Sequence, residues 1–385
     1  MRSNRMIVIS LVLIGVLISC QTTNKIQKEN PSLYRLTQNV RPDFLMGSFS
    51  NGLNFKRKEK EQYSDFFTHN FNILTVGIYM GRTQSKSNKI EFGKMDSLID
   101  YATTNNMKVY LHPLIGGWNY TAKWVNNGNY TAEELHEIMR ERITGILTRY
   151  KGKIDYVDVV NESLTGNGIK EDGSIHWQYK NHKGEKHVWM QTMGMYKGKK
   201  HDFPQYLVDA FRISREVADP NVKLILNEWG AETTKSFRGE VFFQIVKNLR
   251  EEGIPVDGAG MQLHCKLRDG TFYDWTGKTV FDFDAFDEML SKYEKEGIEV
   301  HITEFDIHLK DKPTQEDFEL QGKYYAKVLR HVLKSPNVKS FKTWGFTDAH
   351  SWKANGENGY PLMLDENLTP KPAYQEMVDM LNEFN

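Results

Sequence analysis

Short apolar runs alternate with longer amphipathic segments along most of this chain, and this alternation constrains the fold more than any other feature. The runs have the length and composition of buried strands, and the segments between them repeat apolar residues at helical spacing. The expected strands are Phe44–Ser48, Phe71–Val76, Met107–Ile115, Ile154–Asn161, Val222–Asn227, Gly258–His264, Glu299–Asp306 and Val338–Trp344. Eight strands separated by helices predict an α/β fold, a (β/α)8 TIM barrel built as a single domain from residues 43–385.

The segments between the runs support this prediction. Thr131 and Glu134 have capping-box spacing, and an amphipathic pattern follows them. Further helices are expected at Phe203–Val217, Val241–Glu252, Phe283–Glu296, Asp317–Leu333 and Ala373–Phe384. A doubly wound open sheet is the alternative, but no glycine-rich nucleotide loop follows the first strand.

The N-terminus is typical of an exported lipoprotein. Arg2 and Arg5 precede an apolar run over 7–18, which is shorter than the about 20 residues that a membrane-spanning helix needs. The run ends Leu-Ile-Ser-Cys20, which resembles a bacterial lipobox, although an ordinary signal peptide with an incidental cysteine is the alternative. We expect a signal peptide over 1–19, lipidation of Cys20 and a flexible tether over 20–42. Gln21 favours the outer membrane, with the protein on the cell surface or facing the periplasm.

Charge and cysteine content exclude some function classes. The chain has 50 basic and 50 acidic residues, whereas nucleic-acid binding favours a basic surplus. Two cysteines cannot form a disulfide framework or a cysteine-rich zinc site. Histidines at 176, 182, 187 and 201 match no common ligand spacing, so we expect a solvated loop over 163–202, with a cleft extension by Trp177 or Trp189 as the alternative. We expect no metal, no cofactor, no nucleic-acid partner and a monomer.

Two glutamates stand at strand ends, where barrels of this kind carry their active sites. Asn161 and Glu162 end the fourth expected strand, and Glu304 and Asp306 end the seventh. A carboxylate at such a position is costly unless it is used or paired. Two facing carboxylates are what glycosidic cleavage needs, whereas structural ion pairing is the alternative for either one alone.

Side chains on the neighbouring strands strengthen the catalytic interpretation. Gln262 and His264 are two apart on the sixth strand and therefore share a face. His264 is expected to bridge Glu304 and Asp306 and to keep the nucleophile oriented and ionised. Trp344 and Trp352, near the end of the eighth strand, are expected to stack on sugar rings.

At these residues the chain resembles glycoside hydrolase family 10, the retaining endo-β-1,4-xylanases, over nearly all of 43–385. The matching segments are Asp158-Val-Val-Asn-Glu162, Ile302-Thr-Glu-Phe-Asp306, Asp257-Gly-Ala-Gly-Met-Gln-Leu-His264, Trp344-Gly-Phe-Thr-Asp348 with Ser351-Trp352, and Leu364-Asp-Glu-Asn-Leu-Thr-Pro-Lys-Pro-Ala-Tyr374. Asn227-Glu228-Trp229 resembles the family's fifth-strand Asn-Asp-Tyr.

The resemblance implies a role for each matching residue. Glu162 is the acid/base and Glu304 the nucleophile of a double displacement, with carboxylates about 5–5.5 Å apart. Asn161 binds the sugar 2-hydroxyl, and Gln262 and His264 support that sugar and the nucleophile. The remaining site residues that it implies are Asp306, His112 (the third-strand histidine) and the two subsite walls Trp344 and Trp352. The implied substrate is xylan, and no cofactor is implied.

The chain departs from the family where the non-reducing side of the substrate binds. The family's second-strand glutamate, asparagine and lysine are replaced by Gly77, Ile78 and Gly81, and its third-strand Trp-His pair by Gly116-Gly117. Three interpretations remain open: plain xylan bound more weakly, a decorated or mixed-linkage xylan, or another β-linked glycan. A non-catalytic glycan-binding lipoprotein and a metal-dependent barrel hydrolase are the alternatives from other classes.

Overall fold

The structure is a computed structural model, and it describes residues 31–49, 60–87, 89–117, 120–171, 175–177, 180, 184, 186–352 and 359–384. Parallel strands close into a barrel, because β1 pairs with both β2 and β15, and β11 pairs with β14. The barrel strands are β1 (Leu45–Phe49), β2 (Ile73–Gly77), β3 (Lys108–His112), β5 (Tyr156–Asn161), β10 (Lys223–Glu228), β11 (Gly258–Met261), β14 (Glu299–His308) and β15 (Val338–Thr343). The predicted (β/α)8 fold is confirmed.

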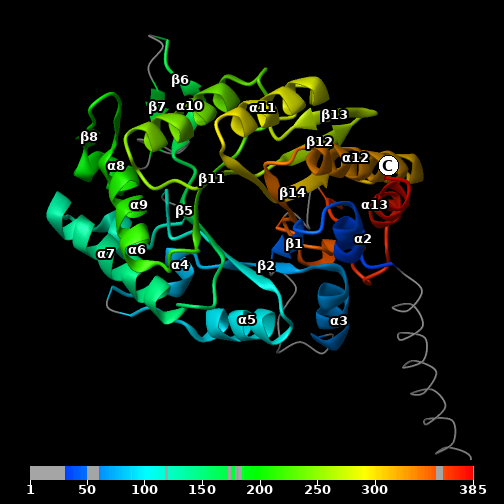
Figure 1. Cartoon of the computed structure of the whole chain (residues 1–385), viewed down its shortest axis with the longest axis horizontal. Coiled ribbons are helices and arrows are strands. Elements are labelled where there is room, and N and C mark those ends of the chain that lie inside the picture. The colour runs from blue at the N-terminus through cyan, green and yellow to red at the C-terminus, as the bar shows by residue number, and fades with distance from the viewer. Residues whose placement is uncertain are drawn as a thin grey trace, which may run out of the picture.

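Helices between these strands surround the barrel (Figure 1). They are α3 (Lys60–Asn70), α5 (Gly93–Thr104), α7 (Ala132–Arg149), α9 (Gln205–Val217), α10 (Phe237–Glu251), α11 (Phe283–Lys295), α12 (Gln315–Lys334) and α13 (Pro372–Asn382). The expected capping box starts α7: the Thr131 hydroxyl accepts a bond from the backbone N–H of Glu134, and the Glu134 carboxylate accepts one from the N–H of Thr131.

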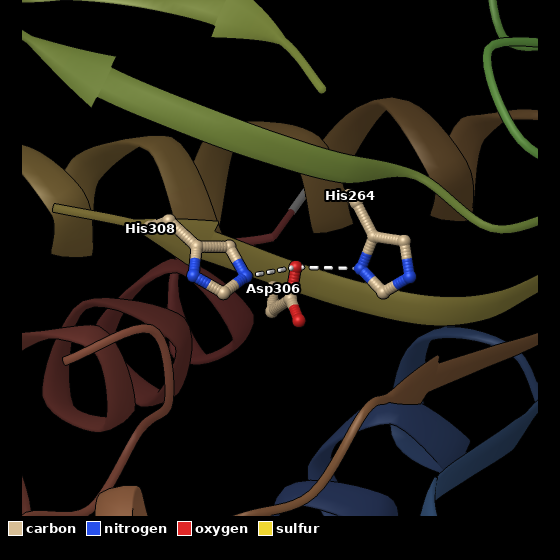
Figure 2. Close-up of side chains that lie close together, drawn as sticks. All are labelled: His264, Asp306 and His308. Atoms are coloured by element: carbon tan, nitrogen blue, oxygen red, sulfur yellow. Dashed lines mark hydrogen bonds and ion pairs between the residues drawn. The ribbon is translucent and has the colours of Figure 1, made fainter. Parts of the chain in front are cut away.

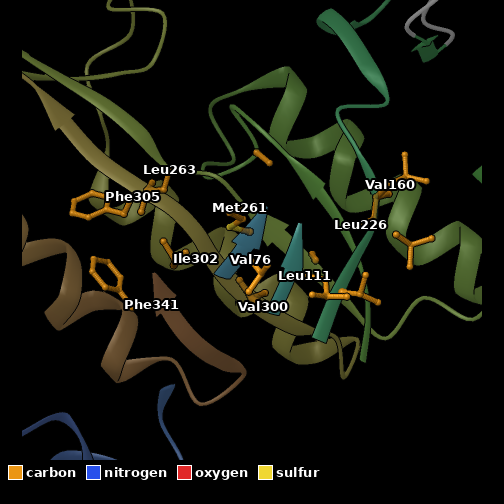
Figure 3. Close-up of a cluster of buried hydrophobic side chains, with 14 of the residues drawn as sticks. Val76, Leu111, Val160, Leu226, Met261, Leu263, Val300, Ile302, Phe305 and Phe341 are labelled. Atoms are coloured by element: carbon orange, nitrogen blue, oxygen red, sulfur yellow. The ribbon is translucent and has the colours of Figure 1, made fainter. Parts of the chain in front are cut away.

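Strand alternation decides which side chains reach the barrel interior. On β3, Val109 and Leu111 belong to the main buried apolar cluster, together with residues of α5 and α7. Tyr110 and His112, one position along, instead contact Asp158 on the neighbouring strand β5. Figure 3 shows members of the apolar cluster contributed by β2, β3, β5, β10, β11, β14 and β15. Burial of this layer stabilises the barrel. Tyr110 packs in a separate, smaller apolar cluster with Ile73 and Ile225.

The predicted flexible tether over 20–42 is wrong at its C-terminal end. Residues Leu33–Val40 form helix α2, which lies beside α13 (Figure 1). Leu33 is fully buried, and the Tyr374 hydroxyl donates to the carbonyl of Pro31 at 2.8 Å. An apolar helix face that packs on the barrel is favourable enough to order this segment. Residues 1–30, including Cys20, lie outside the described residues.

The predicted sixth strand also needs correction. The sixth strand does not run unbroken to His264: β11 ends at Met261, Leu263 has a φ of 58°, and β12 (His264–Arg268) begins beyond it. The backbone N–H of Leu263 instead donates to the buried carboxylate of Glu232 at 2.9 Å, which holds the kink.

The segment 163–202 is not a solvated loop where it is described. It contains β6 (Leu164–Ile169), β7 (Ile175–Trp177), α8 (Val188–Met193) and β8 (Met195–Lys197), and β9 (Asp202–Pro204) pairs with β8. Trp189 is buried, and its indole N–H donates to the Thr121 hydroxyl at 2.9 Å. His187 is also buried and caps α8 by accepting from the N–H of Met190. Among the described residues, no helix has both the length and the apolar character needed to cross a membrane.

Candidate active site

Glu162 lies immediately after β5 in a backbone conformation that residues other than glycine rarely adopt, with a φ of 57°. Its N–H donates to the carbonyl of Asn227, which holds the turn in place. Its Oε1 accepts a hydrogen bond from the Tyr120 hydroxyl at 2.7 Å and another from the Gln262 amide at 3.1 Å. Strained backbone of this kind is common where a side chain has to be aimed into a site.

Glu304 is held by donors on three sides. Its Oε1 accepts from Nδ2 of Asn227 at 2.8 Å, and Nε2 of His112 lies 3.9 Å from the same oxygen. Its Oε2 faces Nε2 of His264 at 3.3 Å. The carboxylate is nearly buried, with 4% of the residue exposed. These contacts fix its orientation.

Side-chain amides connect the two carboxylates. Asn227 donates through Nδ2 to Asn161 at 2.9 Å as well as to Glu304, and Asn161 in turn donates to Glu162 at 3.3 Å. The Thr303 hydroxyl donates to Oδ1 of Asn227 at 2.8 Å and so fixes which way that amide points. The sequence places Asn227 at a strand end, yet its role as the central donor was not predicted.

The predicted bridge by His264 is confirmed. Its Nδ1 lies 2.7 Å from Oδ1 of Asp306, and its Nε2 faces Glu304. Burial lowers the pKa of His264, but the carboxylates of Asp306 and Glu304 outweigh burial and raise this pKa to about 10. His264 is therefore an imidazolium at neutral pH, and its positive charge faces the Glu304 carboxyl group.

Asp306 is shared by two histidines (Figure 2). Nε2 of His308 lies 3.1 Å from the same oxygen that His264 contacts, and the Trp352 indole donates to the other oxygen at 3.0 Å. Of the described residues, these two histidines and Asp306 have ligand atoms close enough together to hold a metal ion. His264 is hydrogen-bonded to this Asp306 oxygen, and His308 lies at ion-pair distance from it, so the three side chains contact one another directly.

The buried carboxylate of Asp158 lies behind the site and contacts two of its supporting side chains. Asp158 accepts from the Tyr110 hydroxyl at 2.6 Å and contacts Nδ1 of His112 at 2.7 Å. Nζ of Lys342 lies 3.2 Å from the centroid of the Tyr110 ring. Burial lowers the pKa of Lys342 to about 7, against the opposing pull of Asp158 and Glu304. His112 thus orients Glu304 while being oriented itself by Asp158.

The two glutamates line one cavity of about 880 Å³. Trp344 and Trp352 lie on its wall, as predicted, and so do Gln262 and His264. Asn161, His112 and Asp306 lie behind this wall, where they contact residues that line the cavity. Trp177 and Trp189 do not line it, so neither extends it. Sequence reasoning missed several other wall residues, which are Phe49, Tyr79, Tyr120, Trp229 and Trp275.

Aromatic rings occupy the space beside the substituted second- and third-strand positions. A Cβ on Gly77 would lie 2.9 Å from the Phe49 ring and 3.0 Å from the Tyr79 ring. A Cβ on Gly116 would lie 2.8 Å from Tyr120. Tyr79 and Tyr120 stack with centroids 5.6 Å apart. The smaller residues therefore leave little empty room here, because the rings of Phe49, at the end of β1, and of Tyr79 and Tyr120 fill it.

Ile78 and Gly81, the other two positions that depart from the family pattern, have different surroundings from Gly77 and Gly116. Ile78 is fully buried in the apolar cluster and does not face the cavity. Gly81 lines the cavity, and a Cβ there would make only an ordinary contact with the Thr121 carbonyl at 3.6 Å. Phe49 stacks on Trp344 with centroids 4.1 Å apart, so this end of the cavity is an aromatic wall.

A (β/α)8 barrel that presents two strand-end glutamates in an aromatic-lined cavity defines the class of glycoside hydrolases. Comparison with known families agrees. The model of glycosyl hydrolase family 10 matches residues 36–380, and the chain belongs to this family.

Named relatives support the assignment. Endo-1,4-beta-xylanase B of Thermotoga neapolitana is 27% identical over 87% of this chain and 88% of its own length. Endo-1,4-beta-xylanase A of the same organism is 32% identical over 79% of this chain, which spans 26% of that longer protein. The crystal structure of xylanase 10B from Thermotoga petrophila RKU-1 in complex with xylobiose has a TM-score of 0.77 at 27% identity, covering 92% of this chain and 98% of that one.

Proposed function

We propose that this chain is an endo-acting β-1,4-xylanase that cleaves with retention of anomeric configuration. The observation that carries the proposal is the unequal setting of the two glutamates in one cavity. Glu304 is contacted by Asn227, His264 and His112, and two of these can carry a positive charge, whereas Glu162 has three neutral donors, Tyr120, Gln262 and Asn161, on one oxygen. A fixed anion beside a second carboxyl group suits a nucleophile paired with an acid/base.

The reaction then proceeds in two displacements. Glu304 attacks the anomeric carbon, the glycosidic C–O bond breaks, and the leaving oxygen takes the proton of Glu162. Water next attacks the same carbon, Glu162 takes a proton from this water, and the bond to Glu304 breaks. His264 remains protonated in both steps and balances the returning charge on Glu304. The contact of Asn161 with the sugar 2-hydroxyl stays a prediction.

The aromatic wall of Phe49, Tyr79 and Tyr120 supports binding of the non-reducing side by ring stacking in place of hydrogen bonds. Stacking of this kind suits the pyranose rings of a β-linked chain such as xylan, because it needs no specific polar partners. Among decorated xylans, acidic ones are favoured by Arg82 and Lys123, which line the same cavity and are exposed. The guanidinium of Arg82 lies over the Tyr79 ring, 5.1 Å from its centroid.

A glycan panel tests the function. The protein is incubated with plain, arabino-substituted and glucurono-substituted β-1,4-xylan, mixed-linkage xylan, cellulose and mannan, and the products are sized over time. Short oligosaccharides from plain xylan are the expected result, and the first-formed anomer is read by proton NMR. Inversion would rule out the proposed roles of the two glutamates. Activity confined to cellulose or mannan would overturn the substrate, and no activity on any glycan would favour a binding protein.

We also propose that the chain is a lipid-anchored outer-membrane protein. The support is the sequence Leu-Ile-Ser-Cys20-Gln after a short apolar run. Cells expressing the chain are labelled with a radioactive fatty acid, and membranes are fractionated. Wild type should carry label in the outer membrane, whereas Cys20→Ala should carry none. Label on the Cys20→Ala variant, or none on the wild type, would contradict lipidation at this residue.

A further inference from the structure

Three hydrogen-bond donors converge on one oxygen of the acid/base Glu162. Its Oε1 accepts from the Tyr120 hydroxyl at 2.7 Å, from the Gln262 amide at 3.1 Å and from the Asn161 amide at 3.3 Å. Among the described residues, none donates a hydrogen bond to Oε2, the second oxygen of the same carboxyl group. The two oxygens of Glu162 therefore have unequal surroundings, although the proton of a free carboxyl group can sit on either oxygen.

The partners of the Asn161 amide decide which way it points. Its Oδ1 accepts from Nδ2 of Asn227 at 2.9 Å and from Nε2 of Gln262 at 3.3 Å. Asn161 consequently turns its Nδ2 donor towards Glu162. A protonated carboxyl group donates through its hydroxyl oxygen and accepts at its carbonyl oxygen. With three donors aimed at it, Oε1 is held as the accepting oxygen, and the proton belongs on Oε2.

Tyr120 is held against Glu162 by its own backbone. It follows β4 (Ile115–Gly116), and its N–H donates to the carbonyl of Gly117 at 2.9 Å. Its carbonyl accepts from the N–H of Gly81 at 3.2 Å, which ties it to the segment that follows β2. A Cβ on Gly116 would lie 2.8 Å from the Cβ of Tyr120, so glycine at 116 makes room for the tyrosine. The segment that departs from the family pattern thus supplies the shortest hydrogen bond to the acid/base.

The Tyr120 hydroxyl is a lasting donor. Burial raises the pKa of Tyr120 well above its usual range, and the carboxylates of Glu162 and Glu304 raise this pKa further. The phenol therefore keeps its proton while Glu162 gives up and regains its own. The Tyr120 ring stacks on Tyr79 with centroids 5.6 Å apart, and both rings line the catalytic cavity. The ring and the hydroxyl of Tyr120 thus have separate contacts, which a substitution by phenylalanine can distinguish.

We propose that Tyr120 is a positioning residue for the acid/base: its hydroxyl keeps Oε1 of Glu162 as an acceptor, so that Oε2 delivers the proton. In the first displacement the glycosidic C–O bond breaks, its electron pair goes to the leaving oxygen, and that oxygen takes the proton from Oε2. The negative charge left on Glu162 is shared with Oε1, where the hydrogen bond from Tyr120 becomes charge-assisted and stronger. In the second displacement, Oε2 takes a proton from the attacking water. This proposal rests on the proposed xylanase function.

Kinetics with two kinds of leaving group test this role. kcat and KM are measured for wild type and Tyr120→Phe on xylan and on an aryl xylobioside whose phenol is strongly acidic. Tyr120→Phe should lower kcat on xylan about 10-fold, the size of one lost charge-assisted hydrogen bond. KM should stay close to wild type, because the stacked ring remains. The burst of phenol from the aryl substrate should keep its wild-type rate, because release of this phenol needs no proton.

Tyr130→Phe is the matched control. It removes a tyrosine hydroxyl from the same segment after β4, where that hydroxyl donates to the carbonyl of Trp124 at 3.3 Å. Tyr130 does not line the catalytic cavity. Tyr130→Phe should therefore match wild type on both substrates, which separates the contact with Glu162 from a general loss of hydroxyl groups in this segment.

A double variant tests whether Tyr120 acts through Glu162. Glu162→Ala has no carboxyl group for Tyr120 to hold, so the further change Tyr120→Phe should alter kcat on xylan by less than about 2-fold. A further loss of about 10-fold would overturn the proposal. So would a phenol burst that slows in Tyr120→Phe as much as kcat on xylan falls, because both results would mean that Tyr120 supports the site without acting on the proton.

The results distinguish this proposal from the xylanase function itself. A wild-type protein that cleaves neither xylan nor the aryl xylobioside refutes the xylanase function. If wild type is active and Tyr120→Phe has wild-type kcat on xylan, the positioning role is refuted while the xylanase function stands.

Discussion

The Nδ2 atom of Asn227 lies 2.8 Å from Oε1 of Glu304 and donates a hydrogen bond to it. Asn227→Asp has nearly the same volume but cannot donate, and it places a second carboxylate beside the nucleophile. We expect kcat to fall about 10- to 100-fold in Asn227→Asp, the size of a lost charge-assisted hydrogen bond, with a smaller change in KM. Steady-state kinetics on xylan check this.

Thr303→Val serves as the matched control for Asn227. It removes the hydroxyl that orients the Asn227 amide at 2.8 Å but keeps the amide itself. We expect kcat to fall less in Thr303→Val than in Asn227→Asp. Wild-type kcat in Asn227→Asp would show that Asn227 only fills space.

The two glutamates should respond differently to the leaving group. Glu162→Ala should lower kcat on xylan about 10²- to 10⁴-fold, because the sugar alkoxide that leaves during cleavage of xylan needs a proton. On an aryl glycoside with a strongly acidic phenol, bond cleavage no longer needs this proton, so a burst of phenol should survive. Glu304→Ala should abolish turnover of both substrates. Stopped-flow release of the phenol distinguishes them, and near wild-type hydrolysis by Glu304→Ala would refute its assignment.

His264 and Lys342 should give opposite pH dependences of stability. The pKa of His264 is raised from 6.5 to about 10, so the stability it contributes is fully present below pH 6.5 and is lost as pH rises towards 10. The pKa of Lys342 is lowered from 10.5 to about 7, so the folded state binds fewer protons between these values and stability rises with pH across that range.

Lys342→Met should therefore uncover the opposing effect of His264. Between about pH 7.5 and about pH 9.5, we expect the free energy of unfolding to fall relative to wild type by about 2 kcal/mol. Urea unfolding at both pH values measures this difference. Parallel pH dependences in the two proteins would show that Lys342 is protonated in the folded state throughout.

Gly77 is expected to tolerate no side chain without moving the aromatic wall. Gly77→Ala places a Cβ within 3.0 Å of the Phe49 ring. Because Phe49 stacks on Trp344, we expect a several-fold rise in KM for xylan with a smaller change in kcat. Gly81→Ala, whose Cβ has ordinary contacts, is the control and should leave KM close to wild type. Equal KM values in both variants would contradict a binding role for the wall.

Helix α2 should contribute to the stability of the barrel. Leu33→Ala removes a fully buried side chain and should lower the free energy of unfolding by about 2–4 kcal/mol. Asn39→Ala changes an exposed residue of the same helix and should have almost no effect. Chemical unfolding of both variants measures the difference. If Leu33→Ala unfolds like wild type, α2 is only loosely attached.

Local patterns were enough to predict much of this protein. Strand and helix periodicity repeat within short segments, so the barrel and the strand ends that carry Glu162 and Glu304 followed from the sequence. The contact of His264 with Asp306 also followed, because neighbouring parallel strands bring their ends together. The helix at Leu33–Val40 was missed although Leu33, Leu36 and Val40 have helical spacing, because it is only eight residues long and its partner, α13, lies at the other end of the chain.

The fold, the pair of glutamates and the family could be predicted before the structure was known, because each depends on residue types at short, regular spacings. The surroundings of those glutamates depend on how distant segments pack together. Tyr120 reaches Glu162, and Phe49 fills the space above Gly77. The residues in these relationships come from different strands and from the segments that follow them, and no periodic pattern in the sequence places one such segment against another.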